Sequence, residues 1–149
     1  MLQSLNVEER IGLNKRILIV DDYSPTRQLI SDALNQSDHY EISEAENGRE
    51  ALDKCSQGRF DLVISDVMMP EMGGMELLNK LREMSPDTSV IMITAQPAVE
   101  LTVSAMKKGA IDFLKKPFNI DDLLYKVQIC FYEKKLMEGE KLGEEAPII

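Results

Sequence analysis

The chain has 149 residues, of which 44% are hydrophobic and 29% charged, and it carries a formal net charge of −9. This length fits one domain that buries enough apolar surface to fold without a disulfide or a structural metal. The acidic balance repels phosphate backbones and anionic lipid, so the chain is not expected to bind nucleic acid or a membrane directly. Cys55 and Cys130 are isolated in the sequence and are interpreted as buried filler side chains.

The expected organisation is a single domain over residues 15–133, flanked by an extension at each end. Residues 1–14 carry scattered charges and no continuous apolar block, which differs from a secretory signal. No apolar run approaches the roughly 20 residues of a membrane helix. These features predict a cytoplasmic protein. Residues 134–149 are expected to form a C-terminal helical extension or tail.

Short apolar runs alternate along the chain with segments of helical periodicity. The first run, 16–20, is unbroken and β-branched, which is typical of a strand covered on both faces. Ser24 is predicted to cap the helix that follows, with Pro25 in its first turn. Residues 40–44 predict a weaker, more polar strand at a sheet edge.

The next helix is predicted to begin at Asn47, with Glu50 placed to return the capping bond. A strand over 60–65 then ends at Asp66, and a third helix stops before Pro86.

The last part of the chain repeats the same alternation. Residues 89–93 predict a fourth strand that ends at Thr94, and residues 98–107 predict a helix of small side chains closed by Gly109. A fifth strand over 111–115 precedes Lys116, and the last helix begins after Asn119. Strands and helices in strict alternation predict an α/β fold, with a parallel sheet covered by helices on both faces.

Ligands of such sheets bind beyond the carboxyl ends of the strands. Polar side chains directly follow, or end, four of the predicted strands. They are Asp21, Asp22, Asp66, Thr94 and Lys116. Each alone is ordinarily a turn former, a strand end or a solvated charge. Together, the carboxylates would repel one another unless a cation and the lysine compensate. Oxygen ligands without a nearby His or Cys favour Mg²⁺, which typically binds carboxylates together with a phosphate oxygen, so the cluster predicts a site for a phosphoryl group.

Four segments resemble the response-regulator receiver domain of two-component signalling. They are 19–22 (IVDD), 65–74 (SDVMMPEMGG), 93–95 (ITA) and 116–118 (KPF), in this order and each after its expected strand. The resemblance covers roughly residues 15–131. It implies a flavodoxin-like three-layer (βα)5 sandwich with a five-stranded parallel sheet of order 2-1-3-4-5. It also implies a signalling domain that promotes only its own phosphorylation and dephosphorylation, and not an enzyme.

The resemblance implies a role for each residue of the cluster. Asp66 would be the phosphoacceptor, taking a phosphoryl group from the phosphohistidine of a sensor histidine kinase or a phosphotransfer protein. Asp21, Asp22, Asp66 and the backbone carbonyl of Met68 would hold Mg²⁺. Lys116 would pair with a phosphoryl oxygen.

A second group of residues would respond to the phosphoryl group. Thr94 would donate its hydroxyl to it, and Phe113 would turn inward as Thr94 moves, although an aromatic residue in a last strand is more often plain core. The Lys116–Pro117 bond is expected to be cis. Met68 and Gln96 would flank the path of an attacking water and tune the lifetime of the phosphate.

The signal is expected to leave through the fourth helix, the fifth strand and the last helix, towards a downstream output domain or effector protein. The last helix continues its apolar register beyond the domain to Met137. Two interpretations remain open for this extension. In the first, the extension is a solvated helix end with a tail. In the second, it has a partner: it is a linker to an output domain absent from this chain, or a contact in a homodimer formed on phosphorylation.

Two rival functions share parts of this pattern. A haloacid-dehalogenase-type Mg²⁺ phosphohydrolase would carry its nucleophile after the first strand and a second Asp two positions later, whereas Asp21 and Asp22 are adjacent and Tyr23 follows. A degenerate receiver acting only as a binding module would lack an acidic or lysine position, and none is lost here.

Overall fold

The computed structural model describes residues 15–37 and 39–142. The strands are β1 (Lys15–Val20), β2 (Tyr40–Ala45), β3 (Leu62–Asp66), β4 (Ser89–Thr94) and β5 (Asp112–Lys115). The helices are α2 (Ser24–Leu34), α3 (Gly48–Gln57), α4 (Gly74–Met84), α5 (Val99–Lys107) and α6 (Ile120–Leu142). The predicted N-terminal extension and the part of the tail after Leu142 lie outside the described residues.

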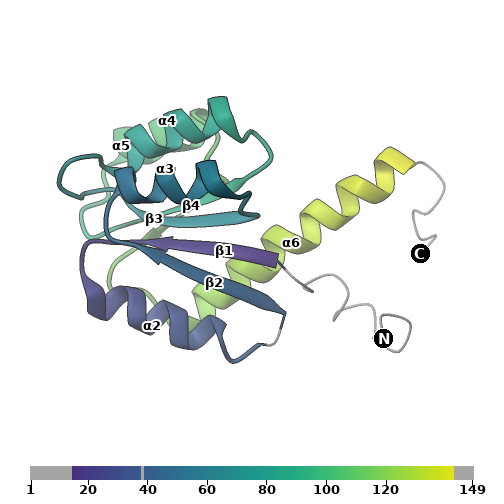
Figure 1. The fold of residues 1–149 in the computed structure, drawn as a ribbon, viewed down its shortest axis with the longest axis horizontal. Helices are drawn as coiled ribbons and strands as arrows, with labels where there is room; N and C mark the ends of the chain where they lie inside the picture. Colours follow the sequence, from purple (N-terminus) through teal and green to yellow (C-terminus); the bar gives the residue numbers. More distant parts are fainter. Residues whose placement is uncertain (1–14, 38, 143–149) are drawn as a thin grey trace.

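The strands form one parallel sheet of order β2-β1-β3-β4-β5, which confirms the predicted fold and topology. Figure 1 shows the sheet between two layers of helices, with α2 and α6 on one face and α3, α4 and α5 on the other. The polar strand β2 lies at one edge, as its sequence predicted.

The unbroken apolar strands are buried on both faces of the sheet. In β1, Ile17 and Ile19 pack into the cluster shared with α2 and α6, whereas Leu18 and Val20 pack into the cluster shared with α3, α4 and α5. Successive side chains of a strand point to opposite faces, so a strand with a helix layer on each side must be apolar throughout. A rigid central sheet results, and its strand ends are fixed relative to one another.

Two helix starts differ in detail from the predictions. Ser24 was expected to cap α2, but the N-cap position is Tyr23, which makes no side-chain capping bond. The Asp21 carboxylate instead accepts the Tyr23 backbone N–H at 2.9 Å, so the turn is closed earlier and Ser24 already lies inside the helix. In α3 the Asn47 side chain accepts the Glu50 N–H as predicted, but the Glu50 carboxylate accepts the backbone N–H of Glu46 instead of that of Asn47.

The last helix, α6, is continuous from Ile120 to Leu142 and passes through Gly139. Contact with the rest of the domain continues past residue 133, because Lys134 Nζ donates to the backbone oxygen of Asp61 at 2.7 Å. The proposed boundary at 133/134 therefore falls inside one helix. Among the helices described, none combines the length and apolar character that a bilayer crossing requires.

Candidate functional site

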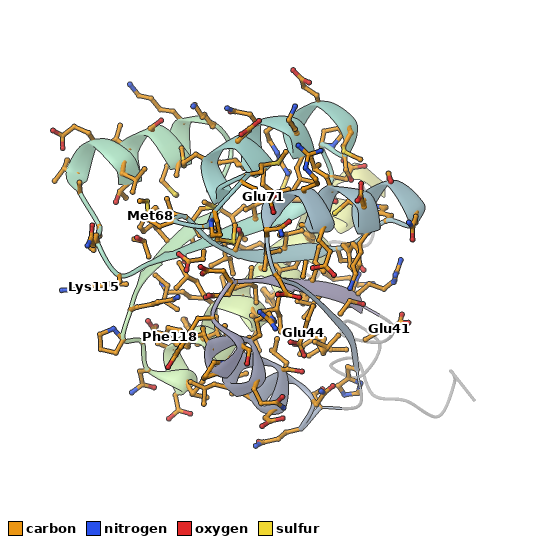
Figure 2. The ribbon with its side chains drawn as sticks, turned by 60° about the vertical axis from the view of Figure 1, so that its left-hand side comes forward. Glu41, Glu44, Met68, Glu71, Lys115 and Phe118 are labelled. Carbon is orange, nitrogen blue, oxygen red and sulfur yellow. The ribbon has the colours of Figure 1, made fainter. Side chains whose placement is uncertain are left out.

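The predicted site residues meet at the carboxyl edge of the sheet. Asp21 directly follows β1, Asp66 is the last residue of β3, Thr94 is the last residue of β4, and Lys116 directly follows β5. The parallel register aligns these strand ends, because Asp66 pairs with Ile93 and Thr94 with Lys115. In Figure 2 the labels of Met68 and Lys115 mark this end of the molecule.

Lys116 lies between the two most buried carboxylates of this edge. Its Nζ donates to Asp21 Oδ2 at 2.7 Å and to Asp66 Oδ2 at 2.9 Å. Asp21 and Asp66 are only 1% and 6% exposed. The Lys116 backbone N–H donates to the Thr94 carbonyl at 2.7 Å, so the start of this long side chain is fixed on β4. The Lys116–Pro117 bond is cis, as expected.

Asp22 completes an acidic cluster with these two residues. Ligand oxygens from Asp21, Asp22 and Asp66 all lie within 4.8 Å of one another, although Asp22 itself is exposed. Carboxylate oxygens with an open side are the ligands of a hard cation such as Mg²⁺, which keeps several of its waters. The donor set therefore fits a magnesium ion, with the exposed side available to water and a phosphate oxygen.

Burial and charge act on Asp21 and Lys116 in different ways. Burial raises the pKa of the Asp21 carboxyl, and Asp66 adds to this effect, while bonds from Lys116 and the Tyr23 N–H counteract it only in part. Burial alone would lower the pKa of the Lys116 ammonium, but its bonds to Asp21 and Asp66 outweigh this and raise it. The charged form of Lys116 is therefore favoured by its carboxylate partners, whereas burial disfavours the ionised form of Asp21.

The loop after β3 turns sharply around the Asp66 carboxylate. The Met68 N–H donates to Asp66 Oδ1 at 3.2 Å, and the Gly74 N–H donates to the Val67 carbonyl at 2.9 Å. A Cβ added to Gly74 would lie 2.2 Å from the Asp66 carbonyl oxygen, so only glycine fits this close approach. Glu71 adopts a positive φ of 67° in the same loop. The tight packing of this turn therefore depends on Gly74, and the Met68 carbonyl as a ligand remains a prediction.

Thr94 and Phe113 lie on the same face of the sheet. The register pairs Met92 with Phe113, and Thr94 is two residues beyond Met92, so both side chains point to the layer of α3, α4 and α5. Thr94 is fully buried, and its Oγ1 accepts the Gln96 N–H at 3.1 Å. Phe113 is half-buried against the core cluster of that layer.

One basic residue beside the cluster was not predicted from the sequence. Arg27 on α2 donates from Nη1 to the Asp21 backbone oxygen at 2.6 Å and from Nε to Glu44 Oε1 at 3.1 Å. A basic residue in the helix that directly follows the acidic turn was the available signal, but no motif contains it.

Comparisons with known proteins agree with this geometry. The family model described as "Response regulator receiver domain" matches residues 17–128. The chain is 41% identical over 109 residues to the chemotaxis protein CheY of Listeria monocytogenes, covering 73% of this chain and 92% of that protein. It is 35% identical over 136 residues to the transcriptional regulatory protein ZraR of Escherichia coli, covering 91% of this chain and 30% of that protein.

A solved structure extends the agreement to three dimensions. The CheY-like response regulator receiver domain protein of Methanospirillum hungatei superposes with a TM-score of 0.78 at 34% identity, covering 82% of this chain and 97% of that one. The fold, the acidic edge and these matches define a two-component signalling domain. The chain belongs to the response regulator receiver domain family.

The raised pKa of Asp21 leads to a prediction about stability. Because the folded protein holds this proton more tightly than the unfolded chain, stability falls as pH rises from the ordinary carboxyl pKa to the raised one. At pH 7, in buffer without divalent cations, Asp21→Asn is therefore expected to raise the unfolding temperature, measured by circular dichroism. The exposed Asp53→Asn is the control and should leave it unchanged. A lower unfolding temperature for Asp21→Asn would show that ionised Asp21 stabilises the fold.

Proposed function

We propose that this chain accepts a phosphoryl group on Asp66 from the phosphohistidine of a sensor histidine kinase or a phosphotransfer protein, with Mg²⁺ as cofactor. The observation that carries the proposal is the buried Asp66 carboxylate, hydrogen-bonded to Lys116 within an acidic cluster at the carboxyl edge of a parallel sheet. Membership of the receiver family supports it.

The chain's own residues would carry the transfer by position and charge. An Asp66 oxygen forms the new bond to phosphorus while the phosphorus–nitrogen bond of the phosphohistidine breaks and its electron pair returns to the imidazole. Lys116 Nζ, already 2.9 Å from Asp66 Oδ2, is placed to bind an oxygen of the arriving group. Asp21, Asp22, Asp66 and the Met68 carbonyl would hold the ion, which supplies positive charge to the phosphoryl oxygens.

Phosphorylation would then bias the domain between two states. It adds roughly one negative charge and new acceptor oxygens, to which Thr94 and Lys116 can donate. A shift from 1% to 99% of the active state needs about 5.5 kcal/mol of differential interaction. Two or three charge-assisted hydrogen bonds of about 1.5–3 kcal/mol each are sufficient.

The proposed switching face consists of α5, β5 and α6. Within α5 only Ala105 is buried, whereas Val99 is 76% and Val103 45% exposed, so displacing this helix disturbs little packing. Phe113 shares a sheet face with Thr94 and would couple the movement of Thr94 to the switching face by packing alone. The signal would pass to a downstream output domain or effector protein.

The extension of α6 supports a further contact beyond the domain. Leu123, Val127, Cys130 and Phe131 are buried against the sheet side. Tyr125, Tyr132 and Leu136 are 61%, 52% and 44% exposed. Their spacing of seven and four residues places these three on one separate face of the helix. We propose that the extended helix either links the domain to an output domain or contacts a second copy of the chain on phosphorylation.

The phosphoacceptor assignment is tested by labelling. With Mg²⁺ and acetyl phosphate, one acyl phosphate should form on the wild type and map to Asp66 by peptide mass spectrometry. Asp66→Asn should abolish the label without loss of fold, because the amide cannot attack phosphorus, and EDTA should abolish it in the wild type. Asp53→Asn should label normally. Stoichiometric label at another residue of Asp66→Asn would refute the assignment.

The lifetime of the phosphate is expected to be intermediate, because Met68 cannot orient an attacking water whereas Gln96 can. Met68→Asn should accelerate spontaneous loss by up to about tenfold, the effect of one added neutral hydrogen bond. The decay of the radiolabelled protein measures this rate, and Met84→Asn, at another exposed methionine, should leave it unchanged. An identical decay for Met68→Asn and the wild type would remove Met68 from this role.

The α6 extension is tested by mass measurement. Light scattering after size exclusion should give a monomer without a phosphate mimic and a dimer with beryllofluoride. Leu136→Glu should keep the treated chain monomeric, whereas Lys135→Glu, at the neighbouring exposed residue on another face of the helix, should dimerise normally. A monomer in every condition would exclude the dimer contact and leave the solvated end and the linker as interpretations.

A further inference from the structure

We propose that Arg27 is a positioning residue that fixes the turn between β1 and α2 and thereby sets the affinity of the acidic cluster for a divalent cation. That turn carries Asp21 and Asp22, two of the cluster's three carboxylates. The inference rests on the proposed magnesium site and deepens it, because it assigns a residue outside every motif of the sequence.

The contacts of Arg27 join the turn to the edge strand. Nη1 donates to the Asp21 backbone oxygen at 2.6 Å, and Nε lies 3.1 Å from Glu44 Oε1 in an ion pair. The Arg27 side chain is 14% exposed. A guanidinium is planar, so its two bonds share one plane, and fixing one nitrogen on Glu44 orients the other towards the carbonyl.

Glu44 is itself a fixed anchor. It lies in β2, where it pairs in register with Ile19 of β1, and Lys54 Nζ donates to its backbone oxygen. The next residue, Ala45, accepts the Asp21 backbone N–H at 3.1 Å. The backbone of Asp21 is therefore held on both sides, through its N–H by Ala45 and through its carbonyl by Arg27.

The orientation of this peptide group decides where two carboxylates point. The Asp21 carbonyl belongs to the peptide bond that joins Asp21 to Asp22, so its orientation is tied to ψ of Asp21 and φ of Asp22, the torsions that place the two side chains relative to each other. The Asp21 carboxylate is held by Lys116 as well, but Asp22 is exposed, and its direction depends on the backbone. Groups that orient metal ligands in this way typically change metal affinity by about 10–100-fold when removed.

Charge and positioning predict opposite effects of removing Arg27. Deleting a positive charge close to a cation site should tighten cation binding by Coulomb's law. Losing the bond from Arg27 to the Asp21 carbonyl should weaken cation binding. The sign of the change therefore separates the two explanations.

The same domain provides a matched control at the opposite end of β2. Arg16 also pairs through Nε with a glutamate of this strand, Glu41 at 3.4 Å, and also donates from Nη1 to a backbone oxygen, that of Arg59 at 2.8 Å. Figure 2 labels Glu44 closer than Glu41 to the end of the sheet marked by Met68 and Lys115. Arg16→Gln removes equivalent polar contacts, and also the contact of the guanidinium with the Phe60 ring, away from the acidic cluster.

The experiment measures Mg²⁺ binding to the whole chain by titration of backbone amide NMR shifts, in the wild type, Arg27→Gln, Arg27→Lys and Arg16→Gln. Arg27→Gln should raise the dissociation constant by at least about tenfold. Arg27→Lys should also bind more weakly than the wild type, because an ammonium keeps the charge but lacks the planar fork. Arg16→Gln should bind as the wild type does. With acetyl phosphate, Arg27→Gln should need more Mg²⁺ for half-maximal labelling and reach a wild-type rate at saturation.

Equal or tighter Mg²⁺ binding by Arg27→Gln overturns the proposal, as does wild-type binding by Arg27→Lys. An equal loss of affinity in Arg16→Gln also overturns it, because the effect would then be general destabilisation. If Arg27→Gln does not fold, Arg27→Lys decides alone. If the wild type binds no Mg²⁺, the proposed function itself is wrong. If the wild type binds Mg²⁺ and Arg27→Gln binds it equally well, only the role of Arg27 is wrong.

Discussion

The contact on which the site depends is that of the Lys116 ammonium with the buried carboxylates of Asp21 and Asp66. Two carboxylates less than 5 Å apart repel by about 3–4 kcal/mol at an effective dielectric constant of 20. One ammonium among three carboxylates leaves two negative charges uncompensated. A divalent cation would supply the missing charge, and its preference for oxygen ligands and water matches a cluster that is open on the side of Asp22.

The fold keeps these charges together through backbone geometry. The apolar strands are fixed between two helix layers, so the residues at their carboxyl ends cannot separate to relieve the repulsion. The Thr94 carbonyl holds the Lys116 backbone, and Arg27 holds the Asp21 carbonyl. Burial of Asp21 at this edge raises the pKa of its carboxyl, and the nearby Asp66 charge contributes a smaller part of the effect. Such a site is expected to lower the stability of the domain without a cation, and it would gain favourable interactions if a cation or phosphoryl group bound.

Much of this arrangement could be predicted from the sequence because the ends of apolar runs mark the ends of the strands. Apolar runs that stop at Asp21, Asp66 and Thr94, in strict alternation with helical segments, predict one sheet edge and one cluster. The capping role of Ser24 was wrong, because the Asp21 side chain closes the turn first, and that depends on a rotamer that no spacing reveals. Arg27 was missed for a similar reason, since its bond to Glu44 joins residues 17 positions apart on a helix and an edge strand.

The most direct test of the charge-compensation account is a crystal structure of the chain grown with Mn²⁺, whose anomalous scattering locates the ion. The account predicts one metal ion among the carboxylates of Asp21, Asp22 and Asp66, with water on its exposed side and Lys116 still in contact with Asp66. A structure at millimolar Mn²⁺ with no ion in that cluster, or with the ion bound at another site only, would contradict it.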